Sequence, residues 1–182
     1  VSSFWESRGG RFPDVTFFGL QYYLKRYLAG QVVTEEKIRE AEEVFGAHFG
    51  DHEAFNAAGW RHILAKHGGR LPVEIRAVAE GTTVPVSNAL MTIENTDPEV
   101  PWLTNYLETM LSMVWYPTTV ATQSRAMRAL ILGALERTGD PSLIAFKLHD
   151  FGFRGSTSKE SASIGAGAPR VNFQGTATLP GI

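Results

Sequence analysis

The chain of 182 residues contains no cysteine. Disulfide bonds, cysteine-ligated zinc and a cysteine nucleophile are therefore excluded. An excess of either charge is missing too, because 17 Lys and Arg residues against 19 Asp and Glu residues leave a net charge of −2. The basic residues are scattered, so no positive surface is expected to attract phosphate backbones, and we expect no nucleic-acid partner.

Long hydrophobic runs are also lacking. The longest apolar stretches, residues 107–116 and 127–135, are interrupted by polar residues, so we expect no membrane span. Residues 1–20 lack the basic start and uninterrupted apolar block of a signal peptide. Val1 stands inside a strand-like run and Ile182 follows a Leu-Pro-Gly turn. We therefore expect a segment of a longer cytosolic protein, or a chain with missing ends.

What is present is clear hydrophobic periodicity, typical of a globular fold. Thr34 is suited to cap a helix, and Gly68 to end one. The first part combines helices with a small antiparallel sheet, and from residue 118 a helix–strand–helix–strand order indicates a parallel sheet or barrel. The predicted strands cover residues 1–7, 73–79, 89–94, 146–149 and 171–173, and the predicted helices cover 15–29, a stretch after Thr34, 53–67, 98–116, 118–138 and 156–168.

The segment Lys147–Glu160 carries the clearest chemical signal. A predicted strand ends near its start, and Thr157 with Glu160 fits a capping box that opens a helix. Helix N-termini and arginine both favour anions, so Arg154 at this position indicates a phosphate or carboxylate ligand. One ring of Phe151 or Phe153 could provide a stacking surface. The structural alternative, with Phe151 in the core and Arg154 either solvated or paired to a carboxylate, is the commoner outcome and stays open.

Other candidate sites are weaker. His48, Asp51 and His52 have spacing close to that of metal ligands, but a fourth ligand and the Glu of an H-E-x-x-H motif are absent. His62 and His67 are expected to face solvent. No metal ligand is assigned, and without a G-x-S-x-G motif no catalytic residue is assigned either.

Several sequence blocks resemble the nicotinamide phosphoribosyltransferase family. They lie at residues 17–22, 33–38, 94–99, 115–122, 149–155 and 171–176. The resemblance implies an α/β protein of the type II phosphoribosyltransferase class. An α+β N-terminal part would occupy residues 1–116, and the first βα units of an irregular, incomplete α/β barrel would occupy residues 117–182.

The resemblance also implies an activity. Members of this family join nicotinamide to phosphoribosyl pyrophosphate, which gives nicotinamide mononucleotide and pyrophosphate in NAD salvage. They use Mg²⁺ and ATP, whose ligands are not expected in this segment. They are cytoplasmic homodimers with active sites shared across the interface. We expect the segment alone to be inactive.

Four positions match site residues of the family. Phe151 corresponds to the aromatic residue that stacks on the pyridine ring, and Arg154 and Arg8 correspond to arginines that bind phosphate groups. Ala177 stands where the family has an aspartate that faces the carboxamide of nicotinamide. This departure leaves two alternatives open: a nicotinate phosphoribosyltransferase, or a non-catalytic relic of the fold that only dimerises.

Overall fold

A computed structural model gives the fold and describes residues 1–176 and residue 178. These residues form two compact units. The first unit contains residues 1–4, 21–76 and 92–110, and the second contains residues 5–20, 77–91 and the described residues from 111 onward. The mixture of helices and short strands confirms the expected α+β arrangement. Within the described residues, no helix combines the length and hydropathy needed to cross a membrane.

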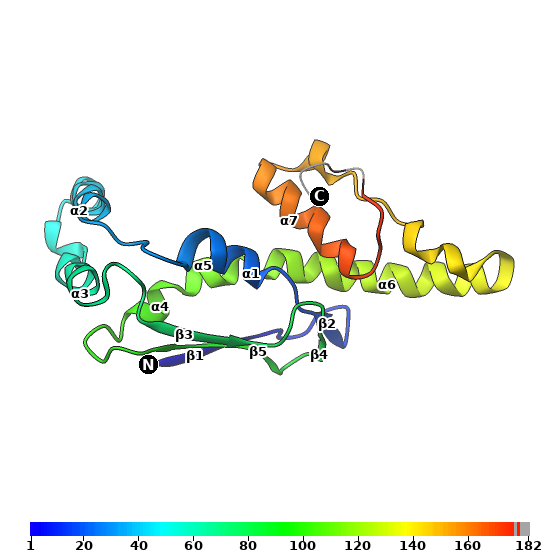
Figure 1. The fold of residues 1–182 in the computed structure, drawn as a ribbon, viewed down its shortest axis with the longest axis horizontal. Helices are drawn as coiled ribbons and strands as arrows, with labels where there is room; N and C mark the ends of the chain where they lie inside the picture. Colours follow the sequence, from blue (N-terminus) through cyan, green and yellow to red (C-terminus); the bar gives the residue numbers. More distant parts are fainter. Residues whose placement is uncertain (177, 179–182) are drawn as a thin grey trace. The chain divides into compact units, whose positions relative to one another are not determined.

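The elements, with η marking a 3₁₀ or π turn, follow one another along the chain (Figure 1). They are β1 (Ser2–Glu6), β2 (Asp14–Thr16), α1 (Leu20–Tyr23), η1 (Leu24–Leu28), α2 (Glu35–Phe49), η2 (His52–Ala54), α3 (Ala57–His67), β3 (Val73–Ala77), β4 (Thr83–Pro85), β5 (Ala89–Asn95), α4 (Leu103–Tyr106), α5 (Glu108–Ser112), α6 (Trp115–Thr138), η3 (Pro141–Phe146), η4 (Gly152–Gly155), α7 (Lys159–Gly167) and η5 (Ala168–Val171).

Local capping sets the ends of the two long helices in the first unit. The Thr34 hydroxyl accepts a hydrogen bond from the Lys37 N–H, which confirms the predicted start of α2. The Asn56 side chain caps α3 in the same way, and Gly68 ends α3 with a left-handed φ of 60°. A sheet with the strand order β1-β5-β3 completes this part of the fold, and the greater part of each strand lies in the first unit.

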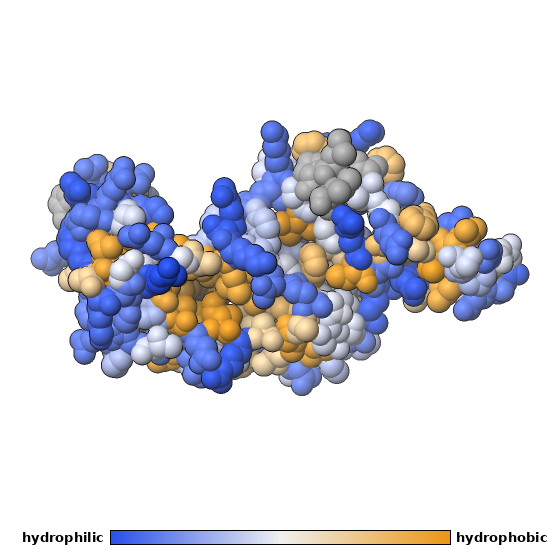
Figure 2. Space-filling model, in the orientation of Figure 1, coloured by the Kyte–Doolittle hydropathy of each residue, from blue (hydrophilic) through white to orange (hydrophobic). Residues whose placement is uncertain are grey.

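An ion-pair network joins α2 to α3. The Arg61 guanidinium lies 3.0 Å from a Glu35 carboxylate oxygen and 2.8 Å from a Glu42 carboxylate oxygen. One arginine thus holds two turns of α2 against α3. On the face drawn in Figure 2, the surface of these two helices is mainly hydrophilic. Glu36 and Glu40 of α2 are exposed.

Helix α6 is the central element of the second unit. Its buried hydroxyls satisfy the backbone of the strand segment that precedes α1. The Thr122 hydroxyl accepts from the Thr16 N–H at 2.9 Å and donates to the Thr118 carbonyl at 2.7 Å. The Thr118 hydroxyl accepts from the Phe18 N–H at 3.3 Å. Because buried N–H groups require partners, these threonines fix the position of β2 along α6.

Two glycines permit close packing against α6. Gly19 has a φ of +106°, and a Cβ there would lie 2.4 Å from a Pro117 ring carbon. A Cβ on Gly165 of α7 would lie 2.4 Å from the Tyr116 hydroxyl. Helix α7 packs against α6 at this glycine (Figure 1).

The predicted strands at residues 146–149 and 171–173 are wrong. Residues 141–146 form the 3₁₀ turn η3. The second segment begins with Val171, the last residue of the 3₁₀ turn η5, and continues without strand structure. The physical reason for η3 is local: the Asp140 carboxylate accepts from the Ser142 N–H, and Pro141 has a φ suited to a helical start. A strand also needs a neighbouring strand for its hydrogen bonds, and no described residue after Asn95 forms one.

Other predicted boundaries were partly wrong. Residues 15 and 16, predicted to begin a helix, belong instead to β2, which pairs antiparallel with the unpredicted strand β4 in the register Val15 to Val84. The single helix expected over residues 98–116 is divided into α4 and α5. The domain division between residues 116 and 117 stays a prediction.

Candidate functional site

The candidate site is built on the turn segment, which we define as residues 149–158 of the second unit. Asp150 organises its start, because its carboxylate accepts from the Gly152 N–H at 3.2 Å. The Thr178 hydroxyl donates to the same carboxylate at 2.5 Å and is itself buried. The Ser156 hydroxyl donates to the Gly152 carbonyl at 2.8 Å and closes the turn. Polar side chains of the turn segment and the Thr178 hydroxyl therefore order the turn, and the side chains of Phe151, Phe153 and Arg154 take no part in these hydrogen bonds.

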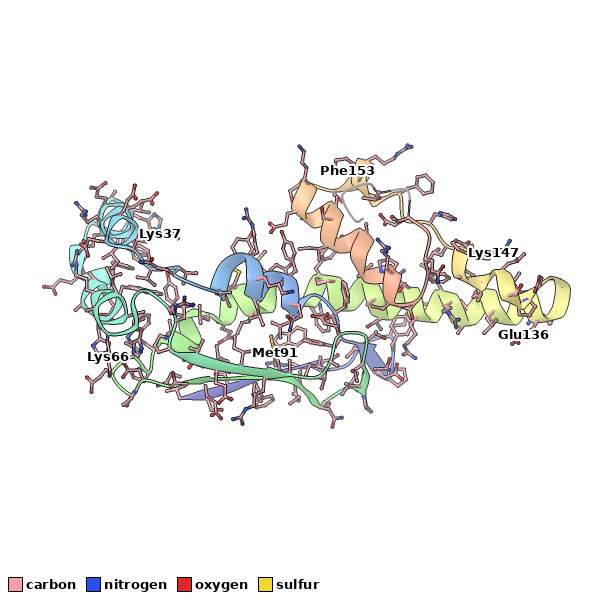
Figure 3. The ribbon with its side chains drawn as sticks, viewed as in Figure 1. Lys37, Lys66, Met91, Glu136, Lys147 and Phe153 are labelled. Carbon is pink, nitrogen blue, oxygen red and sulfur yellow. The ribbon has the colours of Figure 1, made fainter. Side chains whose placement is uncertain are left out.

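Both phenylalanines of the turn segment face outward. Phe151 is 60% exposed and Phe153 is 45% exposed. Figure 3 labels Phe153 on this turn, between α7 and the η3 region of the chain. The structural alternative that places Phe151 in the core is thus wrong. Large exposed rings are unfavourable in water, so a surface that presents two of them is suited to stacking against a flat ligand.

The two arginines assigned to phosphate binding are both exposed. Arg154 lies in η4 and forms no ion pair with a described residue. Arg8 follows β1 and precedes the glycine pair Gly9-Gly10, and it also has no ionic partner in the described part of the chain. No described contact joins Arg8 to the turn segment. Their roles in phosphate binding stay predictions.

The N-terminus of α7 follows the turn segment, one residue later than predicted. The cap is Ser158, whose hydroxyl accepts from the Ser161 N–H at 3.0 Å. The predicted capping box of Thr157 and Glu160 is therefore wrong. Three successive hydroxyl residues precede α7, and the residue with extended backbone next to the first helical turn becomes the cap. The free N–H groups of α7 still begin directly after the turn, as an anion site requires.

The chain near position 177 returns to the start of the turn segment. A Cβ on Gly175 would lie 2.7 Å from the His149 ring, and Thr178 bonds to Asp150 as described above. Ala177 itself lies outside the described residues. Gly175 and Thr178 lie against His149 and Asp150, the two residues that precede Phe151, so the sequence blocks at 149–155 and 171–176 converge in space.

A second polar cluster, in the first unit, was missed by the sequence reasoning. His62 and His67 do not face open solvent, because each Nε2 atom donates to Asp97 Oδ2, at 2.9 Å and 2.7 Å. The Lys66 ammonium lies 3.0 Å from the same oxygen. Asp97 is only 2% exposed. Thirty residues separate His67 from Asp97, so no spacing in the sequence links them.

The electrostatics of this cluster favour the ionised carboxylate. Hydrogen bonds from His67 and His62, then from the Glu99 N–H, hold the pKa of the Asp97 carboxyl well below its usual range. A buried carboxylate without such donors would be strongly destabilised. We define this group, His62, Lys66, His67 and Asp97, as the Asp97 cluster.

A hollow of about 670 Å³ lies beside α6 in the second unit. Arg125 and Arg128 line it together with Asp14 and Asn172. Arg125 pairs with Asp14, and the Arg128 Nε donates to the Asn172 carbonyl at 3.1 Å. The two arginines therefore already have acceptors within the chain, although the buried Arg125 Nε has no partner among the described residues.

The Mg²⁺ implied by the family does not fit the residues described here. Mg²⁺ prefers oxygen ligands in an octahedral arrangement. The one group of three potential ligands that converges in the described part of the chain is His62, His67 and Asp97, which offers two nitrogens and one oxygen. No step of the chemistry is therefore assigned to Mg²⁺ at these residues.

One family model and several curated relatives that match this chain carry the same family name. Residues 1–75 match the family model "Nicotinamide phosphoribosyltransferase, N-terminal domain". A protein of Xanthomonas campestris pv. campestris, named nicotinamide phosphoribosyltransferase, is 49% identical over 176 residues, which are 96% of this chain and 37% of the relative. Proteins with the same name from Acinetobacter baylyi and Mycoplasma pneumoniae are 29% and 30% identical, over 92% and 75% of this chain and 34% and 30% of their own length. The chain thus spans about a third of the length of these relatives.

Proposed function

This chain belongs to the nicotinamide phosphoribosyltransferase family, and from that premise we propose that the protein carrying it joins nicotinamide to phosphoribosyl pyrophosphate. The products are nicotinamide mononucleotide and pyrophosphate, in NAD salvage. One observation in the structure supports this most directly: Phe151 is exposed on the same short turn as Arg154, which has no ionic partner among the described residues.

The chemistry explains why an aromatic ring and a cation serve this reaction. The lone pair of the pyridine nitrogen attacks C1 of the ribose, while the bond from C1 to the pyrophosphate oxygen breaks. Positive charge develops on the sugar and negative charge on the leaving group. A fixed guanidinium near the phosphates therefore stabilises the transition state more than the ground state. In this proposal Arg154 and Arg8 supply that charge.

Orientation of the pyridine is the second requirement. Its ring nitrogen carries no proton to remove, so no general base is needed at that atom. The ring must instead be held with the nitrogen directed at C1. Phe151 is proposed to stack on it, and stacked aromatic pairs contribute about 0.5–1.5 kcal/mol beyond the burial of their surfaces.

Nicotinate is a second candidate substrate, favoured by one observation. Ala177 has a methyl side chain where the family has an aspartate. An aspartate would accept hydrogen bonds from the carboxamide of nicotinamide and repel the carboxylate of nicotinate. Ala177 does neither, so the protein loses one means of preferring the amide.

The proposal includes the wider setting that the family implies. We propose that the intact protein is a cytoplasmic homodimer whose active sites are shared between subunits, and that it uses Mg²⁺ and ATP. Mg²⁺ would neutralise charge on the phosphates when bound. The oxygen ligands for it remain unassigned in the described residues.

A matched pair of variants tests the proposed function in the intact protein. Formation of nicotinamide mononucleotide is measured for the unmodified protein, Phe151→Ala and Phe153→Ala. Loss of the stacking ring is expected to raise the KM for nicotinamide by about 2- to 12-fold in Phe151→Ala. Phe153→Ala removes an exposed ring two residues away and is expected to change KM less than twofold.

Two results would count against this proposal. If the two substitutions change KM equally, Phe151 does not stack on the pyridine ring. An unmodified protein that neither forms nor binds nicotinamide mononucleotide would instead favour the non-catalytic relic of the fold.

A further inference from the structure

We propose that His62, His67 and Asp97 form a binding site for a divalent transition-metal ion such as Zn²⁺. One ring nitrogen from each imidazole and one Asp97 carboxylate oxygen all lie within 4.8 Å of one another. The Nε2 atom of each ring lies within hydrogen-bond distance of Asp97 Oδ2. The three residues belong to the first unit, so the site does not depend on the turn segment. The proposal goes beyond phosphoribosyl transfer and does not require it.

The local fold presents these ligands from two elements. His62 and His67 lie in the last turns of α3, just before Gly68 ends the helix. Asp97 lies in the turn that follows β5. Its backbone carbonyl accepts from the Asn95 side-chain amide at 2.8 Å, and its Oδ1 accepts from the Glu99 N–H at 3.1 Å. These bonds orient the carboxylate without using Oδ2, and such supporting bonds are typical around metal ligands.

The donor set indicates the class of ion. Two imidazole nitrogens and one carboxylate oxygen suit Zn²⁺ and similar transition metals, which take three protein ligands and leave a fourth position for water. Ligands about 2.0–2.1 Å from zinc lie about 3.3 Å apart in a tetrahedral shell. The present separations of 2.9 Å and 2.7 Å are those of hydrogen bonds, so each must widen by about 0.5 Å. Each ring nitrogen must also exchange its proton for the metal, and a neutral imidazole can carry the proton on Nδ1 instead.

Asp97 Oδ2 already pairs with one cation, the Lys66 ammonium. The ammonium lies 3.0 Å from Asp97 Oδ2, the atom proposed to bind the metal. The Lys66 side chain is 53% exposed, whereas Asp97 is 2% exposed. The ammonium can therefore turn into solvent, while the carboxylate stays in place. A metal ion and the Lys66 ammonium would compete for one oxygen, which gives the proposal a distinctive test. Figure 3 labels Lys66 near the end of α3.

The experiment titrates the intact protein with Zn²⁺ alone, by calorimetry at neutral pH, and repeats the titration with three variants. His67→Gln keeps an N–H donor for Asp97 but removes a metal ligand, and is expected to weaken Zn²⁺ binding at least tenfold. Lys66→Met removes the competing cation and is expected to tighten binding several-fold. His48→Gln, at an exposed histidine of α2, is the matched control and is expected to leave the affinity unchanged.

Co²⁺ provides a second measurement through its visible absorption. A bound Co²⁺ with three protein ligands and one water is expected to give the intense bands of a tetrahedral site, and His62→Gln is expected to remove them. Circular dichroism of every variant establishes that it is folded. Zn²⁺ affinity that is equal in His67→Gln and the unmodified protein, or weaker in Lys66→Met, would overturn the metal site and leave a purely structural ion-pair cluster. Failure here leaves the proposed transferase activity untouched, because the readout is binding and not turnover.

Discussion

Two regions of the second unit differ in what their polar side chains bond to. In the layer between α6 and β2, each buried hydroxyl that we described is bonded to backbone from the other element or from its own helix, as Thr122 is to Thr16 and Thr118. In the turn segment, polar bonds only hold the turn itself, while Phe151 and Arg154 project outward. In the first region the hydroxyls already have hydrogen-bond partners within the chain. In the second region Phe151 and Arg154 are exposed and available to contact a ligand.

From this difference we predict that stability and binding depend on different residues of the second unit. Removing a hydroxyl of α6 leaves a buried N–H donor without an acceptor, so the free energy of unfolding should fall. Removing an exposed side chain from the turn segment changes few contacts within the chain, so stability should be unchanged. Activity should fall, because the proposed contact to substrate is lost. The three predictions below test this separation, from the largest expected effect to the smallest.

The largest effect is expected for Arg154→Ala in the intact protein. A charge-assisted contact to a phosphate that is withdrawn from water contributes about 1.5–3 kcal/mol, so kcat/KM for phosphoribosyl pyrophosphate should fall about 10- to 150-fold. The melting temperature should stay within a degree or two, because Arg154 has no ionic partner in the described chain. Steady-state kinetics and thermal melts measure the two quantities.

Arg137→Ala is the control for this variant. Arg137 is exposed in the last turn of α6, within the same unit. It should leave both kcat/KM and the melting temperature nearly unchanged. A large loss of stability in Arg154→Ala, or an equal loss of activity in both variants, would break the distinction drawn between the two regions.

A stability effect is expected for Thr122→Val, which preserves shape and removes the hydroxyl. The Thr16 N–H then loses its acceptor in a buried place, which should lower the free energy of unfolding by about 1–3 kcal/mol. Thr119→Val is the matched control, because the Thr119 hydroxyl is exposed and bonds only to the Trp115 carbonyl within α6. Urea titrations of the two variants compare them, and similar midpoints would contradict the role given to the buried hydroxyl.

The smallest of the three effects concerns substrate choice. Ala177→Asp adds an acceptor for the carboxamide of nicotinamide and a charge that repels nicotinate. The ratio of kcat/KM for nicotinamide over nicotinate should rise about tenfold. Ala177→Asn has nearly the same size without the charge and should shift the ratio less. If the ratio stays constant in both variants, position 177 does not face the carboxamide group.

The sequence predicted those parts of the fold that local interactions decide. Thr34 and Gly68 mark helix ends because capping depends on neighbouring residues. The strand predicted over residues 146–149 failed because strand formation requires a distant partner, whereas the Asp140-Pro141 start of η3 acts locally. The strand propensity of residues 146–149 could not show that a partner strand is missing.

The same reasoning applies to the candidate site. Phe151 and Arg154 became candidates because they lie together in one short segment. Both side chains are exposed, and their roles in binding stay predictions. The Asp97 cluster was missed because α3 and the turn after β5 meet only in the folded chain. The hydroxyl that caps α7 was misplaced by one residue because Thr157 and Ser158 are chemically equivalent for that purpose.

The bonds from Thr118 and Thr122 to residues 16–18 can form only late in synthesis, because the ribosome makes the chain from its N-terminus. About a hundred residues separate the two sides of each bond. At a translation rate of about 5–20 residues per second, the segment that becomes β2 leaves the ribosome roughly 5–20 s before its partners on α6 exist. During that interval its apolar side chains, Val15 and Phe17 among them, lack their final cover. In the nascent chain this segment is therefore accessible to chaperones until α6 has been synthesised.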